Sequence, residues 1–246
     1  MTAPAAADEP TEAPARDVAV IIVAAGASTR TAGRELKQFR WVAGKPMLLH
    51  SVQTFMARPD VASVICVLPK SHAGDPPPWL FQCDVERLMV TVGGRTRFES
   101  VVQGILELPE EARIVLVHDA ARPLLSDEVL ERVVATARTG VGAVAALPVV
   151  DTLKEVDDDG RIVRTVERAR LWRAQTPQGF PREMLEGAYH AAWTARAGSP
   201  VDATDDAAVC ERAGHTVVVV RGSERLLKVT EEPDFARADA IARLAD

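Results

Sequence analysis

Two basic residues near the start of the chain follow a run of small residues. The segment Ala24-Ala25-Gly26-Ala27-Ser28-Thr29 comes directly after the apolar run 18–23 and leads to Arg30, and Lys37 follows seven positions later. Small residues after a buried strand let the backbone approach a ligand closely with its N–H groups accessible. The pattern therefore predicts a phosphate-gripping loop assisted by two cations. Taken alone, it is equally compatible with a surface loop that carries two solvated charges.

Two further candidate ligand-binding segments follow later apolar runs. Gly93 and Gly94 come after run 88–92, and His118-Asp119-Ala120-Ala121-Arg122-Pro123 comes after run 113–117. A glycine pair lets a planar base lie against the main chain, and Ser100 offers a hydroxyl from the first turn of the next helix. Asp119 could hold a ribose hydroxyl or a metal-bound water, although an aspartate that caps a turn is equally expected. His118 is assigned no role.

The elements that must position these segments alternate between strands and helices. Strands are expected at 18–23, 61–68, 88–92, 113–117 and 142–148, and helices at 47–56, 98–108 and 128–137, the last with Ser126 as its capping residue. Such alternation predicts an α/β fold with a Rossmann-like, mainly parallel sheet. Ligands of these folds bind outside the carboxyl ends of the strands, so all three segments are expected at one edge of the sheet.

Composition excludes several classes of function. The chain has 246 residues with a formal charge of -6, which argues against broad binding to nucleic acid or to an acidic membrane surface. Its three cysteines are widely spaced, which favours neither a disulfide framework nor a zinc site and fits a reducing cytoplasm. Residues 1–16 are expected to be a disordered tail, and 17–246 a single domain without a membrane span.

The pattern changes after residue 150. Segments 152–156 and 161–166 flank an Asp-Gly turn and predict a β-hairpin, within an arm at about 151–170. An isolated hairpin is barely stable in water, so a second subunit is the natural support. Beyond the arm, the sequence predicts a helix at 182–196, another capped by Thr204 or Asp205, a strand at 216–220 and a closing helix from Pro233.

Taken together, the motifs resemble those of one enzyme family. They are AAGASTR with Lys37-Gln38-Phe39, Val92-Gly93-Gly94, HDAARP at 118–123, Asp151-Thr152-Leu153-Lys154, Gln175-Thr176-Pro177-Gln178, Thr204-Asp205 and Leu227-Lys228-Val229-Thr230. From about residue 17 to the C-terminus the chain is similar to the 2-C-methyl-D-erythritol 4-phosphate cytidylyltransferases of the non-mevalonate isoprenoid pathway. The resemblance implies a fold of the nucleotide-diphospho-sugar transferase type and an arm that forms a homodimer.

The resemblance also implies roles for individual residues. Arg30 and Lys37 would be catalytic and stabilise the charge that builds on the triphosphate. CTP would be bound by Ala24, Ala25, Gly26, Gly93, Gly94, Ser100, Asp119 and Ala120. Methylerythritol phosphate would be bound by Arg122, Thr152, Arg168, Thr176, Thr204, Asp205 and Lys228. Mg²⁺ would be held mainly by the CTP phosphates without a direct protein ligand, and Asp119 is the candidate for an indirect contact.

Three other interpretations are weighed against this one. A ribitol 5-phosphate cytidylyltransferase would share nearly every motif on the nucleotide side. A dinucleotide-dependent dehydrogenase would have GxGxxG after the first strand, which AAGASTR does not supply. A non-catalytic nucleotide-binding module would tolerate the loss of Arg30 or Lys37. We also expect the loop 27–37 to close on CTP.

Overall fold

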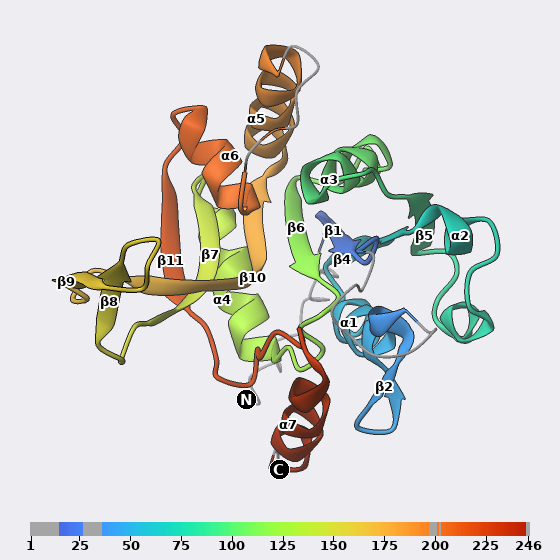
Figure 1. The fold of residues 1–246 in the computed structure, drawn as a ribbon. Coiled ribbons are helices and arrows are strands. Elements are labelled where there is room, and N and C mark those ends of the chain that lie inside the picture. Colours follow the sequence, from blue (N-terminus) through green and yellow to red (C-terminus); the bar gives the residue numbers. More distant parts are fainter. Residues whose placement is uncertain (1–14, 27–35, 197–200, 202, 245–246) are drawn as a thin grey trace, which may run out of the picture.

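A seven-stranded sheet organises the chain (Figure 1). The computed structural model describes residues 15–26, 36–196, 201 and 203–244, so the expected tail at 1–16 lies outside the described residues except for its last two positions. The strand order is β11-β7-β10-β6-β1-β4-β5, and all neighbours run parallel except β10, which is antiparallel to β6 and β7. The strands are β1 Val18–Val23, β4 Val61–Leu68, β5 Leu88–Val92, β6 Ile114–Asp119, β7 Gly142–Pro148, β10 Trp172–Pro181 and β11 Val217–Arg221. The predicted mainly parallel α/β fold is confirmed.

Helices cover both faces of this sheet (Figure 1). They are α1 Met47–Met56, α2 Lys70–Ala73, α3 Arg97–Leu106, α4 Asp127–Ala137, α5 Arg182–Ala195, α6 Asp206–Arg212 and α7 Glu232–Arg243. Side chains alternate along a strand, so Val20 and Ile22 of β1 pack with α1 and α4, whereas Ile21 packs with α3 and α5. Burial on both faces explains why β1 reads as an unbroken apolar run. Within the described ranges, no helix combines the length and apolar character needed to cross a bilayer.

Two local expectations about helix starts had different outcomes. Asp205 caps α6, because its carboxylate accepts a hydrogen bond from the Ala208 backbone N at 3.0 Å. Ser126 precedes α4 as expected, but its side chain makes no capping hydrogen bond. The expectation for Ser126 was therefore wrong in this respect, and Asp127 and Glu128 are left to complement the helix dipole in the first turn.

The strand β10 was not predicted from the sequence. It enters between β6 and β7 and pairs with both in the antiparallel direction. Gly179 permits the close approach of α4, because a Cβ at this position would lie 2.6 Å from Val133 Cγ1. The insertion places Thr176, near the middle of β10, beside the end of β6.

The predicted hairpin is present and forms a separate arm (Figure 1). Its strands β8 Leu153–Val156 and β9 Ile162–Val166 pair only with each other, and Gly160 in the turn has a φ of +78°. A left-handed φ is unfavourable for residues with a Cβ, which explains the glycine. Val156, Ile162 and Val163 are exposed apolar side chains on this arm. Its contact with a second subunit stays a prediction.

Candidate active site

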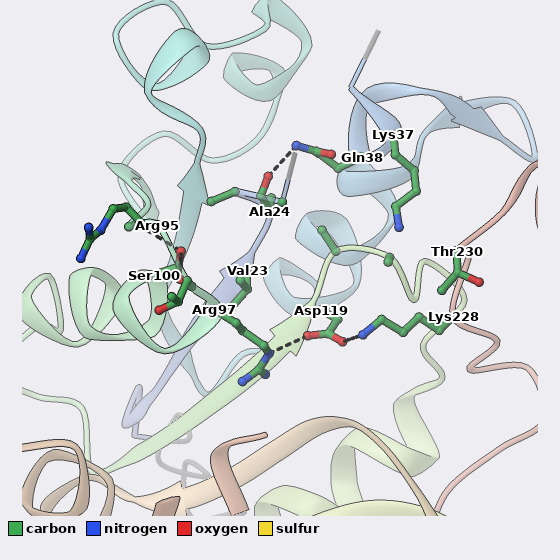
Figure 2. A pocket seen from close by; sticks show the side chains of 16 residues that line it. Val23, Ala24, Lys37, Gln38, Arg95, Arg97, Ser100, Asp119, Lys228 and Thr230 are labelled. Carbon is green, nitrogen blue, oxygen red and sulfur yellow. Dashed lines mark hydrogen bonds and ion pairs between the residues drawn. The ribbon is translucent and has the colours of Figure 1, made fainter. Parts of the chain in front are cut away.

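A pocket of about 490 Å³ opens at the carboxyl ends of β1, β5 and β6 (Figure 2). The strand ends meet there because the three strands run parallel, as expected for this fold. Nine of the predicted site residues line it, namely Ala24, Ala25, Gly26, Lys37, Gly94, Ser100, Asp119, Ala120 and Lys228. The structure thus brings residues from positions 24 to 228 to one edge of the sheet, as predicted.

One wall of the pocket is built from small residues. The predicted residue Gly93 does not itself line the pocket but packs against two residues that do, since a Cβ at Gly93 would lie 2.2 Å from Ala25 Cβ and 3.0 Å from Ser100 Oγ. A larger residue there would push this wall apart. Ser100 Oγ accepts from the Gly94 backbone N at 3.2 Å and donates to Thr96 O at 2.9 Å. The hydroxyl proton is therefore committed to Thr96, and the remaining lone pair of Ser100 can accept from a ligand. A wall of this kind suits a flat heterocycle laid against the main chain.

A short 3₁₀ turn, Lys37–Phe39, carries the second predicted cation to the pocket. Gln38 Nε2 donates to Ala24 O at 2.6 Å, which ties the turn to the end of β1. Lys37 Nζ donates to Val229 O at 2.8 Å, and Figure 2 shows its amine pointing toward the segment that holds Lys228. Arg30 and the expected closure of the loop 27–37 lie outside the described residues, except at the end of that loop.

Asp119 is the charge centre of the pocket. It is the last residue of β6 rather than part of the following turn, and its Oδ2 lies 2.7 Å from Lys228 Nζ while its Oδ1 lies 3.3 Å from Arg97 Nε (Figure 2). Burial opposes ionisation of this carboxyl, but the charges of Arg97 and Lys228 outweigh it and hold the pKa of Asp119 well below its usual range. Asp119 is therefore a carboxylate at neutral pH.

His118 and Thr176, neither of which lines the pocket, hold Asp119 in place through a series of hydrogen bonds. The Asp119 backbone N donates to Thr176 Oγ1 at 3.1 Å, Thr176 Oγ1 lies 3.1 Å from His118 Nδ1, and His118 Nε2 lies 3.1 Å from Arg122 O. Burial lowers the pKa of His118 to about 4, so the ring is neutral at pH 7. With Nε2–H donating to Arg122 O, His118 Nδ1 accepts a hydrogen bond from the Thr176 hydroxyl. Every donor and acceptor in this series of hydrogen bonds then has a partner. No pattern of residues around His118 indicates this supporting role.

Arg97 is a further site residue that no sequence motif predicts. It is the first residue of α3 and lines the pocket, and its guanidinium forms a fork with Asp206 through Nη1–Oδ1 at 2.9 Å and Nη2–Oδ2 at 2.6 Å. Tyr189 donates its hydroxyl to Asp206 Oδ1 at 2.6 Å. A cation at the first position of a helix opposes the helix dipole, and this local conflict was the available signal.

Lys228 is held in place by the segment that leads into α7. Val229 is fully buried in an apolar cluster with Phe235, and Thr230 donates from both its backbone N and its hydroxyl to Asp234 at 2.9 and 2.8 Å. These contacts fix the residues on the carboxyl side of Lys228. Its ammonium group can therefore reach the pocket from a rigid backbone.

Other residues predicted to bind the polyol phosphate lie outside the lining of this pocket. Arg122 donates to Leu226 O at 2.6 Å and to Ala174 O at 3.4 Å. Asp205 caps α6 and accepts from Gln178 Nε2 at 2.8 Å, and Thr204 beside it is exposed. Thr176 contacts the lining residue Asp119 through its hydroxyl, and none of these four residues lines the pocket itself.

Thr152 and Arg168 belong to the arm. Both are exposed, and Arg168 Nη1 donates to Val150 O. Neither residue lines the pocket. Within a single copy of the chain, the structure does not bring these two predicted residues to the other site residues.

The donor set restricts the kind of metal site that the pocket can form. Among the residues that the structure describes, no three His, Cys, Asp or Glu side chains group together as metal ligands. Asp119 is the one carboxylate in the described lining of the pocket. A single ionised carboxylate fits Mg²⁺, which retains water and takes most of its other ligands from substrate phosphates. It does not fit a preformed protein cage for a transition metal.

The fold and the pocket define the class of the protein. A mainly parallel α/β sheet with a small-residue wall and lysines at its carboxyl edge is that of a nucleotidyltransferase with a Rossmann-like domain. The family model of 2-C-methyl-D-erythritol 4-phosphate cytidylyltransferase matches residues 18–244, and the chain belongs to this family. The dehydrogenase interpretation is therefore wrong.

Individual relatives agree with this assignment. The 2-C-methyl-D-erythritol 4-phosphate cytidylyltransferase of Stenotrophomonas maltophilia is 41% identical over 226 residues, which cover 90% of this chain and 95% of the relative. A bifunctional enzyme of Desulfotalea psychrophila is 37% identical over 92% of this chain, and the chain spans 56% of the length of that relative. The crystal structure of the cytidylyltransferase from Thermus thermophilus is similar with a TM-score of 0.77 and 32% identity, covering 92% of this chain and 99% of the other.

Proposed function

We propose that this protein transfers the cytidylyl group of CTP to 2-C-methyl-D-erythritol 4-phosphate, forming 4-diphosphocytidyl-2-C-methyl-D-erythritol and pyrophosphate in non-mevalonate isoprenoid biosynthesis. The observation that carries the proposal is the pocket itself, in a chain that belongs to the corresponding family. It combines a small-residue wall for a base, an ionised Asp119 and two lysines for phosphates. Each of these features matches one part of the two substrates.

CTP is proposed to bind on the side of the pocket that is built from small residues. Ala24, Ala25 and Gly26 let the nucleotide approach the end of β1, and the cytosine ring would lie against the backbone of Gly94 beside Ser100, with Gly93 packed against Ala25 and Ser100. We expect this side of the pocket to exclude the larger purine rings on steric grounds. Asp119 and Ala120, at the end of β6, receive the ribose.

The reaction needs positive charge more than it needs a protein nucleophile. A phosphate oxygen of methylerythritol phosphate attacks the α-phosphorus of CTP, the bond to the β-phosphate oxygen breaks, and pyrophosphate leaves with that electron pair. Two polyanions must meet, so positioning and neutralisation of charge are the main tasks. We assign the neutralisation of the negative charge on the triphosphate to Lys37 and Arg30. The position of Lys37 at the pocket, and not its family role alone, supports this assignment.

Lys228 is assigned to the attacking phosphate. Its ammonium lies beside Asp119, on the side of the pocket opposite to the small-residue wall (Figure 2). Arg168 and Thr152 would reach the same phosphate from the arm, and Arg122, Thr176, Thr204 and Asp205 would shape the polyol side. Because Thr152 and Arg168 do not line the pocket within one chain, we infer that the arm of a second copy supplies them.

Mg²⁺ is the proposed cofactor. Asp119 would hold it through a bound water, and the remaining ligands would be triphosphate oxygens. When bound, the ion supplies neutralisation of the phosphate charge. The chain's own contribution is an ionised, fixed carboxylate in the lining of the pocket.

A homodimer built through the arm is also proposed. The hairpin pairs with no other sheet of the described chain and exposes Val156, Ile162 and Val163. Two strands alone are marginally stable, so a partner that covers these side chains would stabilise the arm.

A reducing compartment such as the cytoplasm suits the three cysteines, which are all free.

Release of pyrophosphate tests the proposed function. Purified protein is supplied with CTP and Mg²⁺, and methylerythritol phosphate is compared with ribitol 5-phosphate, with the Lys37→Met variant as the control for the site. We expect turnover with methylerythritol phosphate that depends on Lys37. Turnover with ribitol 5-phosphate alone would establish the competing cytidylyltransferase activity, and nucleotide binding without turnover would establish a binding module.

A further inference from the structure

Arg97 occupies an unusual position for an arginine. It begins α3, where a cation opposes the helix dipole, yet its side chain is turned inward and is 25% exposed. The neighbouring Arg95 follows the ordinary pattern, because its side chain is 85% exposed. Something in the tertiary structure must therefore offset the local cost of Arg97.

The fork between Arg97 and Asp206 supplies that compensation. Asp206 is fully buried, and its two oxygens receive the two terminal nitrogens of the guanidinium. Tyr189, also buried, donates to Asp206 and stacks on Phe98 with ring centroids 4.7 Å apart. Because the fork is planar, this anchoring determines where the third nitrogen, Nε, points. It points at Asp119 Oδ1.

Two cations and two carboxylates alternate in this part of the structure, so their charges cancel. Asp119 lies between Arg97 and Lys228, and Arg97 lies between Asp119 and Asp206. A phosphate that binds Lys228 competes with Asp119 for the same ammonium. Without Arg97, Asp119 would then face a polyanion with its nearest cation withdrawn.

We propose that Arg97 is a positioning residue that holds the Asp119 carboxylate aligned while Lys228 turns to the phosphate, and that Asp206 and Tyr189 act only by aiming Arg97. This inference rests on the proposed function. It assigns no contact with substrate to Asp206 or Tyr189, neither of which lines the pocket. The outer helices α5 and α6 thereby contribute to the chemistry through one arginine.

A double-mutant cycle between Arg97→Lys and Asp119→Asn tests the proposal. Lysine keeps the charge but cannot span Asp206 and Asp119 with a fixed fork, so we expect kcat/KM for CTP to fall by about 10- to 100-fold. If Arg97 acts through Asp119, the double variant should be within about threefold of Asp119→Asn alone. Losses that multiply would overturn the proposal, because Arg97 would then act independently of Asp119.

Controls separate positioning from general loss of structure. Arg182→Lys is matched, because Arg182 is 24% exposed, pairs with Glu186 at 2.8 Å and lies away from the pocket, and its kcat/KM should stay within about twofold of the wild type. Tyr189→Phe keeps every charge and should lower kcat/KM by a few fold in the wild-type background and not in the Asp119→Asn background. If Arg97→Lys fails to fold, the Tyr189→Phe cycle decides by the same criterion.

The outcomes also distinguish this inference from the proposed function. A wild-type protein that does not turn over CTP with methylerythritol phosphate refutes the function. An active wild type with a fully active Asp119→Asn variant refutes the role of Arg97, because the carboxylate that it positions would not matter. An active wild type with Arg97→Lys at wild-type kcat/KM refutes it equally.

Discussion

Gly93 gives the sharpest prediction about the wall of the pocket. In Gly93→Ala the new methyl carbon would lie 2.2 Å from Ala25 Cβ, where carbon atoms in contact normally stay about 3.5–4.0 Å apart. Ser100 Oγ at 3.0 Å and Val67 Cγ1 at 3.3 Å leave no clear direction for relief. The end of β1 and the start of α3 must therefore move apart.

The expected cost follows from this overlap. Overpacking of a well-packed site costs about 1–3 kcal/mol, which for a domain of this size lowers the melting temperature by roughly 2–12 °C. Because the displaced residues form the wall proposed for cytosine, KM for CTP should rise by about tenfold, equivalent to about 1.4 kcal/mol.

Thermal unfolding and steady-state pyrophosphate release are the assays. Gly187→Ala is the control, since a Cβ at this position in α5 meets nothing within 4 Å and alanine favours a helix, so its melting temperature should be unchanged or higher. Gly93→Ala with the melting temperature and KM of the wild type would refute the reasoning about the wall.

Three further predictions follow from the site. Lys37→Met should lower kcat by about 100-fold with little change in melting temperature, and a wild-type kcat would contradict the role of Lys37. His118 has its pKa lowered to about 4 by burial, whereas the unfolded chain takes up this proton near pH 6.5, so the free energy of unfolding should fall as the pH decreases from about 6.5 to about 4, by on the order of 3 kcal/mol. Urea unfolding at several pH values would show this slope, which should flatten in His118→Gln; an equal slope in both proteins would contradict it. Removal of divalent cations with EDTA should abolish turnover and spare the fold, with recovery on addition of Mg²⁺, and activity that persists in EDTA would refute the metal requirement.

The parallel strands and their helices were predictable because burial leaves a local signature. β1 is an unbroken apolar run, and β4 and β5 are apolar apart from Ser63 and Thr91; the predicted bounds of all three strands and of α1 agree with the observed ones. The end of β6 was placed two residues short, because His118 and Asp119 are polar although they are buried in the strand. Polarity at a functional strand end therefore misleads a pattern based on hydrophobicity.

The strand β10 could not be predicted in the same way. Its sequence contains Gln175, Pro177, Gln178 and Gly179, which are typical of loops. It forms a strand because β6 and β7 flank it on both sides, and that pairing involves residues far apart in the chain. Tertiary context thus overrides local propensity here.

The site residues likewise divide into those that local sequence predicts and those that depend on tertiary contacts. The small residues at 24–26, the glycine pair and Lys228 could be predicted from short motifs. The pairing of Arg97 with Asp206 joins residues 109 positions apart, and nothing in the spacing of either residue indicates the other. Likewise, the support of Asp119 by Thr176 crosses 57 positions and depends on the unpredicted β10.

The fate of the α-phosphate of CTP tests the central claim most directly. With CTP labelled at the α-phosphate, together with methylerythritol phosphate and Mg²⁺, the label should appear in a cytidine diphosphate derivative of methylerythritol, with unlabelled pyrophosphate formed in equal amount. Label recovered as CMP, or left in CTP while methylerythritol phosphate is unchanged, would contradict the assignment of this pocket to cytidylyl transfer.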